Sequence, residues 1–262
     1  MALDGGKSPG SITRRNLVAA TTVAIAALAS RAARANDLRR GIHSGGGDGH
    51  CYLRGTAIRT PSGEREISEL RIGDPVITYS GQPKPIKWMG RRRLQRDDDN
   101  WSAEMMPVKL MPSALDDDVP HRELLLSQYH AIYLDGQLIP AGSLVNGRTI
   151  VALRTPPEVL EYLHIELFEP DVIYAEGVPT ETFLPFESRR TFDNRQEYED
   201  LYGAEQAVSH PPFAPAIPAL RARFQLRSHL RSAVSPWWDI RTPFDIARDR
   251  VETRAGRLRV AA

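Results

Sequence analysis

The chain has 262 residues, of which 41% are hydrophobic and 26% charged, and its formal net charge is +1. This length and composition are typical of a globular protein that buries an apolar core without disulfide bonds. The balanced charge excludes the strongly basic surface typical of nucleic-acid binding proteins, so we expect no nucleic-acid partner. A small arginine surplus after residue 189 is too weak to indicate an acidic partner.

The first 35 residues have the pattern of an export signal. Arg14 and Arg15 precede an uncharged stretch at 17–30, and Ala33 and Ala35 place small residues where a signal peptidase cuts. We therefore predict a twin-arginine signal peptide over 1–35. The protein would be exported to the periplasm or the extracellular space, and it would contact the membrane only during export.

Two alternatives for this segment remain open. An uncleaved membrane anchor would need roughly 20 apolar residues, and the uncharged stretch is shorter than that. An organellar transit segment is allowed because residues 5–36 contain no acidic residue before Asp37. The paired arginines at the head of an alanine-rich stretch favour export over both.

Residues 36–50 form a glycine-rich linker, which ends in Ser44-Gly-Gly-Gly-Asp-Gly-His50. The residue that follows, Cys51, is the only cysteine in the chain. A single cysteine cannot close an internal disulfide, so its thiol is a reactive group, an intermolecular bridge or a buried apolar side chain. Its place directly after a linker favours a reactive thiol that acts on the peptide bond between His50 and Cys51.

In residues 51–187, short segments in which every second residue is apolar are separated by turn residues. This pattern indicates β-strands. We expect strands at 75–80, 86–89, 106–111, 123–134, 138–141, 149–153, 162–167 and 172–175, the first two forming a hairpin. No helix of normal length is expected in this range. The predicted fold class is therefore all-β, a compact domain of short antiparallel strands.

Residues 188–262 differ in composition and are predicted to form a proline-interrupted, partly helical tail. A short helix is expected at 194–202, where Gly203 ends it, and a proline-rich extended segment at 211–218. Apolar residues near helical spacing predict an amphipathic helix at 218–233 that packs on the β-domain. Binding of this helix to a membrane surface is the alternative.

The apolar stretch 123–134 is interrupted by Ser127-Gln-Tyr-His130, and this motif completes a pattern that begins at Cys51. Together with Gly55, Gly73-Asp74 and the segment 162–182, it resembles the Hint (hedgehog/intein) domain family over roughly half of the chain. Such domains open with a nucleophilic cysteine and carry a Thr-x-x-His motif, which is matched here by Ser127 and His130. The arrangement is most similar to bacterial Hint-domain proteins with a hedgehog-type ending.

The resemblance implies a self-acting reaction at the bond between His50 and Cys51. Cys51 would attack the His50 carbonyl in an N-to-S acyl shift, Ser127 would orient the peptide, and His130 would act as general acid and then base. No His-Asn pair occurs in the sequence, and Thr180-Glu181-Thr182 stands at the matching position, so we do not expect full splicing. Water or a small nucleophile would accept the acyl group. The alternative is a catalytically silent exported Hint fold that serves as a scaffold or binding module.

Metal binding is not indicated by the sequence, and we expect no cofactor. Asp116-Asp-Asp118 suggests calcium, but no further oxygen ligands follow at the required spacing. A zinc site could in principle draw on five residues, but none of them share a ligand-like spacing. These residues are His43, His50, Cys51, His121 and His164.

Overall fold

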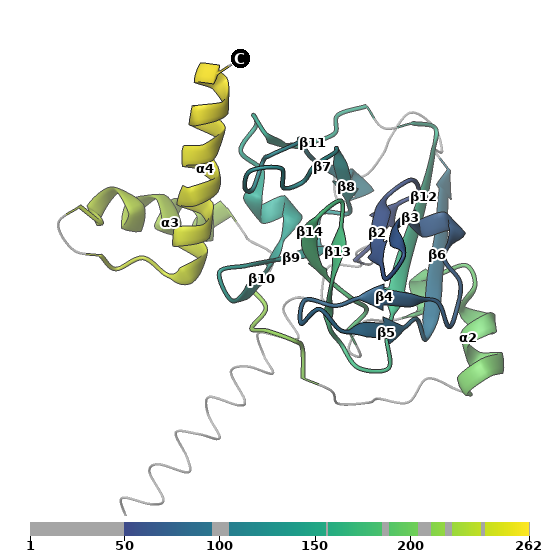
Figure 1. Cartoon of the computed structure of the whole chain (residues 1–262). Coiled ribbons are helices and arrows are strands. Elements are labelled where there is room, and N and C mark those ends of the chain that lie inside the picture. Colours follow the sequence, from purple (N-terminus) through teal and green to yellow (C-terminus); the bar gives the residue numbers. More distant parts are fainter. Residues whose placement is uncertain are drawn as a thin grey trace, which may run out of the picture. The chain divides into compact units, whose positions relative to one another are not determined.

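The computed structural model describes residues 50–95, 105–155, 157–184, 189–203, 211–217, 222–236 and 239–261 (Figure 1). The predicted signal peptide, with Arg14, Arg15, Ala33 and Ala35, and the linker up to residue 49 lie outside this range. Export therefore stays a prediction. Among the described helices, none combines the length and the hydropathy needed to span a bilayer.

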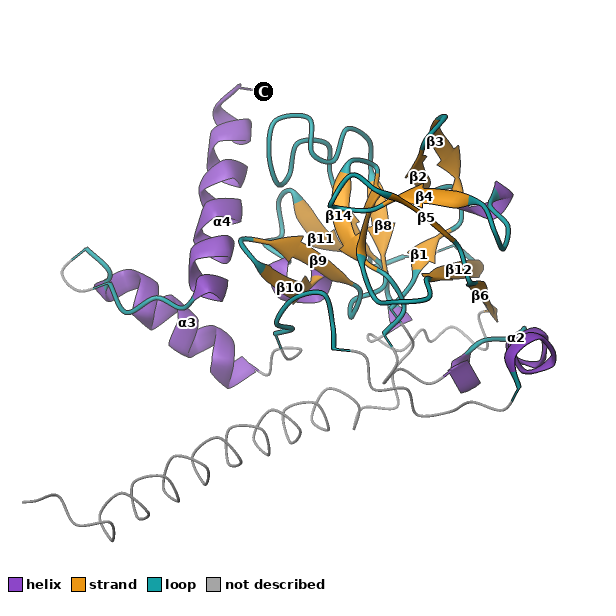
Figure 2. Cartoon of the chain, turned by 60° about the horizontal axis from the view of Figure 1, so that its bottom comes forward, coloured by secondary structure: helices purple, strands orange, loops and turns teal. Residues whose placement is uncertain are grey.

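Up to residue 184 the described chain forms two six-stranded sheets, with turns and loops between the strands (Figure 2). The first sheet has the order β11 (Ile150–Ala152), β7 (Val108–Leu110), β8 (Leu124–Leu126), β1 (Tyr52–Leu53), β12 (Val159–Glu166) and β6 (Trp88–Gln95). The second has the order β10 (Gln137–Pro140), β9 (Ala131–Leu134), β14 (Val178–Glu181), β13 (Val172–Ala175), β2 (Ala57–Thr60) and β3 (Gly63–Glu66). The strand pairs described within both sheets are antiparallel, and the all-β prediction is confirmed.

The smaller elements lie between and after these strands. A separate hairpin pairs β4 (Pro75–Ile77) with β5 (Pro83–Pro85), and three single turns of 3₁₀ helix are η1 (Ile67–Glu69), η3 (Ala141–Leu144) and η4 (Arg189–Thr191). The predicted hairpin partner at 86–89 was wrong, because residues from Trp88 onward belong to β6 and pair with β12. The α-helices are α2 (Arg195–Tyr202), α3 (Ala222–Val234) and α4 (Pro243–Ala261).

Side-chain alternation explains why these segments fold as strands around one core. In β7, Val108 and Leu110 are buried while Lys109 between them is partly exposed, and β8 repeats this pattern. Such period-two burial is what a strand with one face on the core requires. The last five residues of β12 are all buried, because the chain after residue 189 covers the other face of that strand.

A second buried cluster joins the domain to the segment at 189–203. Phe192 packs edge-on against Trp88 with ring centroids 5.4 Å apart, and Tyr198 does the same at 5.5 Å. Gly90 allows this approach, because a Cβ atom there would lie 2.6 Å from the Phe192 ring. Glu166 adds a buried ion-pair network in which its carboxylate accepts hydrogen bonds from Lys87 (2.6 Å) and twice from Arg189 (2.9 Å each).

The tail differs from the prediction in one respect. Helix α2 lies where a helix was expected, and α3 overlaps the predicted amphipathic helix, but the long helix α4 was not foreseen. Asp245 of α4 contacts Arg231 (2.6 Å) and Ser228 of α3, which joins the two helices. The apolar side of α4, with Phe244, Ala247 and Val251, belongs to the main core cluster, so α4 packs on the β-domain.

Candidate active site

The polar motif at 127–130 lies where the chain passes from one sheet to the other. The stretch predicted as a single strand at 123–134 is broken into β8 of the first sheet and β9 of the second, and Ser127 and His130 stand in the turn between them. A hydrogen bond from the His130 N–H to the Ser127 carbonyl closes this turn (3.2 Å). The motif is therefore held between both sheets.

Cys51 and Ser127 bind each other through two hydrogen bonds. The Cys51 N–H, which belongs to the predicted scissile peptide, donates to Ser127 Oγ at 2.9 Å, and the Ser127 N–H donates to the Cys51 carbonyl at 2.9 Å. The contact extends the pairing of β1 with β8, in which Tyr52 faces Leu126. Both residues are buried, and the serine hydroxyl is thereby fixed against the nitrogen that would leave in the reaction.

His130 is fully buried. Its ring lies 4.2 Å from the Tyr52 ring and 5.3 Å from the His164 ring, measured between centroids. Neither Nδ1 nor Nε2 of the His130 ring forms a hydrogen bond of ordinary geometry with any described residue. Burial lowers the pKa of His130 well below 6.5, His164 and His50 lower it further, and Glu181 acts in the opposite direction. The imidazole is therefore neutral near pH 7.

Glu181 at the end of β14 holds the other side of the predicted scissile bond. One oxygen of its carboxylate, Oε1, accepts a hydrogen bond from the Ala131 N–H (2.7 Å) and contacts Nδ1 of His50. The Glu181 side chain is only 1% exposed, so the residue that would supply the attacked carbonyl is anchored to a buried carboxylate. Because Ala131 follows His130, the same carboxylate also fixes the turn that carries the histidine.

Tyr52 and His164 complete the surroundings of His130. The Tyr52 hydroxyl shares a hydrogen bond with Thr180 Oγ1 (2.8 Å), and burial raises the pKa of this phenol far above its usual value, which keeps it neutral. Burial, with a contribution from His50, lowers the pKa of His164 to about 3. Two neutral imidazoles therefore lie side by side in the interior.

The sequence singled out Glu181 only as part of a segment that lacks the asparagine of splicing domains. A signal was nevertheless present, because Thr180, Glu181 and Thr182 are polar residues on a strand that is otherwise apolar. All three are buried, and buried polar residues normally have hydrogen-bond partners. Such a run of polar residues in a core strand indicates a site, although only the fold shows what it contacts.

The residues weighed as metal ligands are not all brought together by the fold. His50, Cys51 and His164 belong to the site just described, His121 lies beside Glu64 and Glu176, and His43 lies outside the described residues. Asp116 and Asp117, considered for calcium, contact the guanidinium groups of Arg250 and Arg254. These positive charges disfavour a calcium ion at that loop.

The candidate site thus draws on both sheets, because Cys51 and Ser127 adjoin strands of the first sheet and Glu181 ends a strand of the second. The family model described as "Hint domain" matches residues 50–187, which is just over half of the chain. The protein therefore belongs to the Hint domain family, as its motifs indicated. A hedgehog-type ending is not tested by this match and stays a prediction.

Solved structures with similar folds are inteins and an intein-like domain. The gp41-1 intein has 16% identity and a TM-score of 0.37, with 51% of this chain and 98% of that chain covered. The bacterial intein-like domain from Clostridium thermocellum has 15% identity and a TM-score of 0.39, with 52% and 100% covered. A DnaB intein from Synechocystis has 12% identity and a TM-score of 0.37, with the same coverage. The comparison with curated proteins found no match.

Proposed function

We propose that this Hint domain carries out an N-to-S acyl shift at the bond between His50 and Cys51, and that the resulting thioester is cleaved by water or a small nucleophile. The observation that carries the proposal is that both sides of this bond are held in the protein interior. Ser127 binds the nitrogen side through Cys51, and Glu181 binds the carbonyl side through His50. Such restraint of both reacting partners is what an intramolecular attack requires.

In the proposed mechanism His130 acts first as a base and then as an acid, the reverse of the order expected from the sequence, because its lowered pKa leaves the imidazole unprotonated. It takes the proton of the Cys51 thiol, and the thiolate sulfur attacks the His50 carbonyl carbon to form a tetrahedral oxyanion. The protonated His130 then gives the same proton to the Cys51 nitrogen, the C–N bond breaks, and a thioester with a free amine remains. A buried imidazolium is a strong acid because its pKa is low, so it suits protonation of a weakly basic amide nitrogen.

The thioester is less stable than the amide, so a second nucleophile must remove it. Attack by water would release a fragment that ends in His50 and leave a chain that begins with Cys51. A hydroxyl-bearing acceptor would instead receive the upstream segment as an ester. We also propose that the upstream segment directs export through the twin-arginine signal, so that cleavage removes only the linker that remains after the signal peptide.

Mass spectrometry of the purified chain tests the proposal. We expect a product that begins at Cys51, its accumulation to accelerate with added thiol or hydroxylamine, and its loss in Cys51→Ala. The His130→Ala variant should slow cleavage strongly, whereas His229→Ala, which removes an exposed imidazole, should not change it. A wild-type chain that stays intact with both reagents would contradict the proposal and favour the catalytically silent Hint fold.

A further inference from the structure

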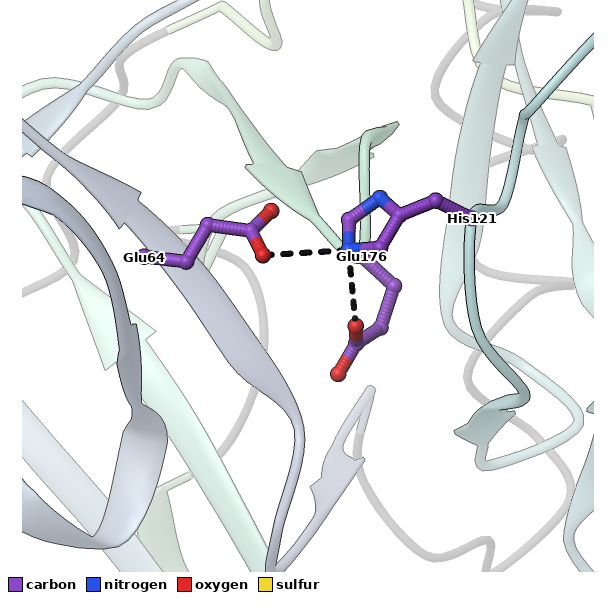
Figure 3. Close-up of side chains that lie close together, drawn as sticks. All are labelled: Glu64, His121 and Glu176. Carbon is purple, nitrogen blue, oxygen red and sulfur yellow. Dashed lines mark ion pairs between the residues drawn. The ribbon is translucent and has the colours of Figure 1, made fainter.

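We propose that Glu64, His121 and Glu176 form a binding site for a divalent transition-metal ion such as Zn²⁺, separate from the site at Cys51. Figure 3 shows the three side chains converging on one point. Glu64 lies on β3, His121 in the loop before β8, and Glu176 in the turn between β13 and β14. That turn is at the opposite end of the β13–β14 hairpin from Glu181.

The distances between the ligand atoms suit a metal with tetrahedral coordination. His121 Nε2 lies 3.0 Å from Glu64 Oε2 and 3.2 Å from Glu176 Oε2, and one ligand atom from each residue lies within 4.8 Å of the others. In a tetrahedral zinc site with bonds of about 2.0–2.1 Å, ligand atoms are separated by about 3.3 Å. Two of the three separations are therefore close to this value, and the third, between the two carboxylates, does not exceed 4.8 Å.

Glu176 is the preorganised ligand of the group. Its side chain is 3% exposed, and its Oε1 accepts a hydrogen bond from the Ala57 N–H (2.7 Å), which leaves Oε2 directed toward His121. The backbone N–H of His121 donates a hydrogen bond to the backbone carbonyl of Glu176 (3.2 Å), which holds the two residues next to each other. Gly177 leaves room for the imidazole, because a Cβ atom there would lie 3.1 Å from His121 Nδ1.

Access and chemistry also suit such an ion. The side chains of His121 and Glu64 are 26% and 35% exposed, so an ion can reach the site from solvent and a water can take the fourth position. One imidazole nitrogen and two carboxylate oxygens form a ligand set that suits Zn²⁺ and neighbouring transition metals better than calcium, which prefers oxygen ligands alone.

Arg122 competes with the ion for the same carboxylates. Its Nε lies 3.0 Å from Glu176 Oε2, and its Nη2 lies 4.0 Å from Glu64 Oε2. The Arg122 side chain is 60% exposed, so an incoming ion can displace it into solvent with little change in packing. Without an ion, Arg122 and His121 both contact the two carboxylates. Binding would exchange this ion-pair network for three metal bonds that fasten β3, the loop and the hairpin together.

Calorimetric titration of the full-length chain with Zn²⁺ tests this site, with the Cys51→Ala variant used throughout so that the thiol cannot bind the metal. We expect one ion per chain and a melting temperature that rises with ion concentration. Glu64→Gln and His121→Gln should each weaken binding at least about tenfold. Arg122→Ala should tighten it, and the control Glu69→Gln, an exposed carboxylate on η1, should leave it unchanged.

Two outcomes would overturn the proposal. One is the absence of saturable binding below millimolar Zn²⁺ in a chain that is folded by circular dichroism. The other is binding that persists unchanged in both Glu64→Gln and His121→Gln, which would place the ion elsewhere. Neither result depends on self-cleavage, so this proposal and the proposed function can fail independently of each other.

Discussion

Replacing Glu181 by glutamine should slow self-cleavage about tenfold to about 100-fold without unfolding the domain. Glutamine has nearly the same shape and keeps a carbonyl oxygen that can accept the Ala131 N–H. The negative charge that binds His50 is lost, however. The variant therefore removes the anchor on the carbonyl side of the scissile bond and preserves the turn that carries His130.

The magnitude follows from the strength of the contact that is lost. A hydrogen bond to a charged group contributes about 1.5–3 kcal/mol, and each 1.4 kcal/mol corresponds to a factor of about ten. If this contact keeps His50 in its place, its loss lowers the fraction of chains in the reactive geometry by that factor. The observed rate should fall in proportion, because only those chains place the carbonyl next to the Cys51 sulfur.

A double-mutant cycle tests the reasoning. Cleavage rates are measured by mass spectrometry for the wild type, Glu181→Gln, His50→Gln and the double variant. We expect each single variant to lose a similar factor and the double variant to lose little more, because both remove one shared contact. The positioning role of Glu181 would be refuted if the loss of rate in the double variant equalled the product of the two single losses. It would also be refuted if Glu181→Gln cleaved at the wild-type rate.

Three further predictions concern stability and are tested by chemical denaturation. Ser127→Ala removes the acceptor of the buried N–H at the scissile bond and should lower the free energy of unfolding by about 1–3 kcal/mol, whereas Ser127→Thr keeps the hydroxyl and should lose less. Glu166→Gln leaves Lys87 and Arg189 without their shared carboxylate and should cost about 3–5 kcal/mol; an unchanged midpoint would mean that water replaces the carboxylate. Because the pKa of His164 is about 3 in the fold and about 6.5 when unfolded, only the unfolded chain binds this proton between those values. His164 alone should then make stability fall by about 1.4 kcal/mol per pH unit from about pH 6.5 down to about pH 3, in addition to any fall due to His130, and His164→Gln should remove that part of the slope.

The sequence predicted the class of fold because its main signal is local. Alternation such as Val108, Lys109 and Leu110 identifies a strand from three neighbouring residues. Which strands pair is not local, since β1 lies between β8 and β12, which follow it by more than seventy residues in the chain. For the same reason the break within 123–134 was not foreseen, because it depends on a hydrogen bond from Ala131 to Glu181.

The residues of the candidate site were likewise predicted only in part from the sequence. Cys51 was predicted from its place directly after the linker, and Ser127 and His130 from the resemblance to the family's Thr-x-x-His motif. The fold joins Cys51 and Ser127 directly. Glu181 was missed as a site residue because its importance depends on where β14 lies. Helix α4 was missed for another reason: Phe244, Ala247, Val251 and Ala255 have helical spacing, but arginines and acidic residues between them lower the mean hydropathy.

The family match ends before the last residues that pack into the buried core of the domain. The match stops at residue 187, yet Phe192 and Tyr198 belong to the same buried cluster as Cys51. A shortened chain that ended at the match would lose both aromatic rings that pack against Trp88. Fragments made for study should therefore extend at least through Gly203, because the segment 189–203 completes the buried cluster that contains Cys51.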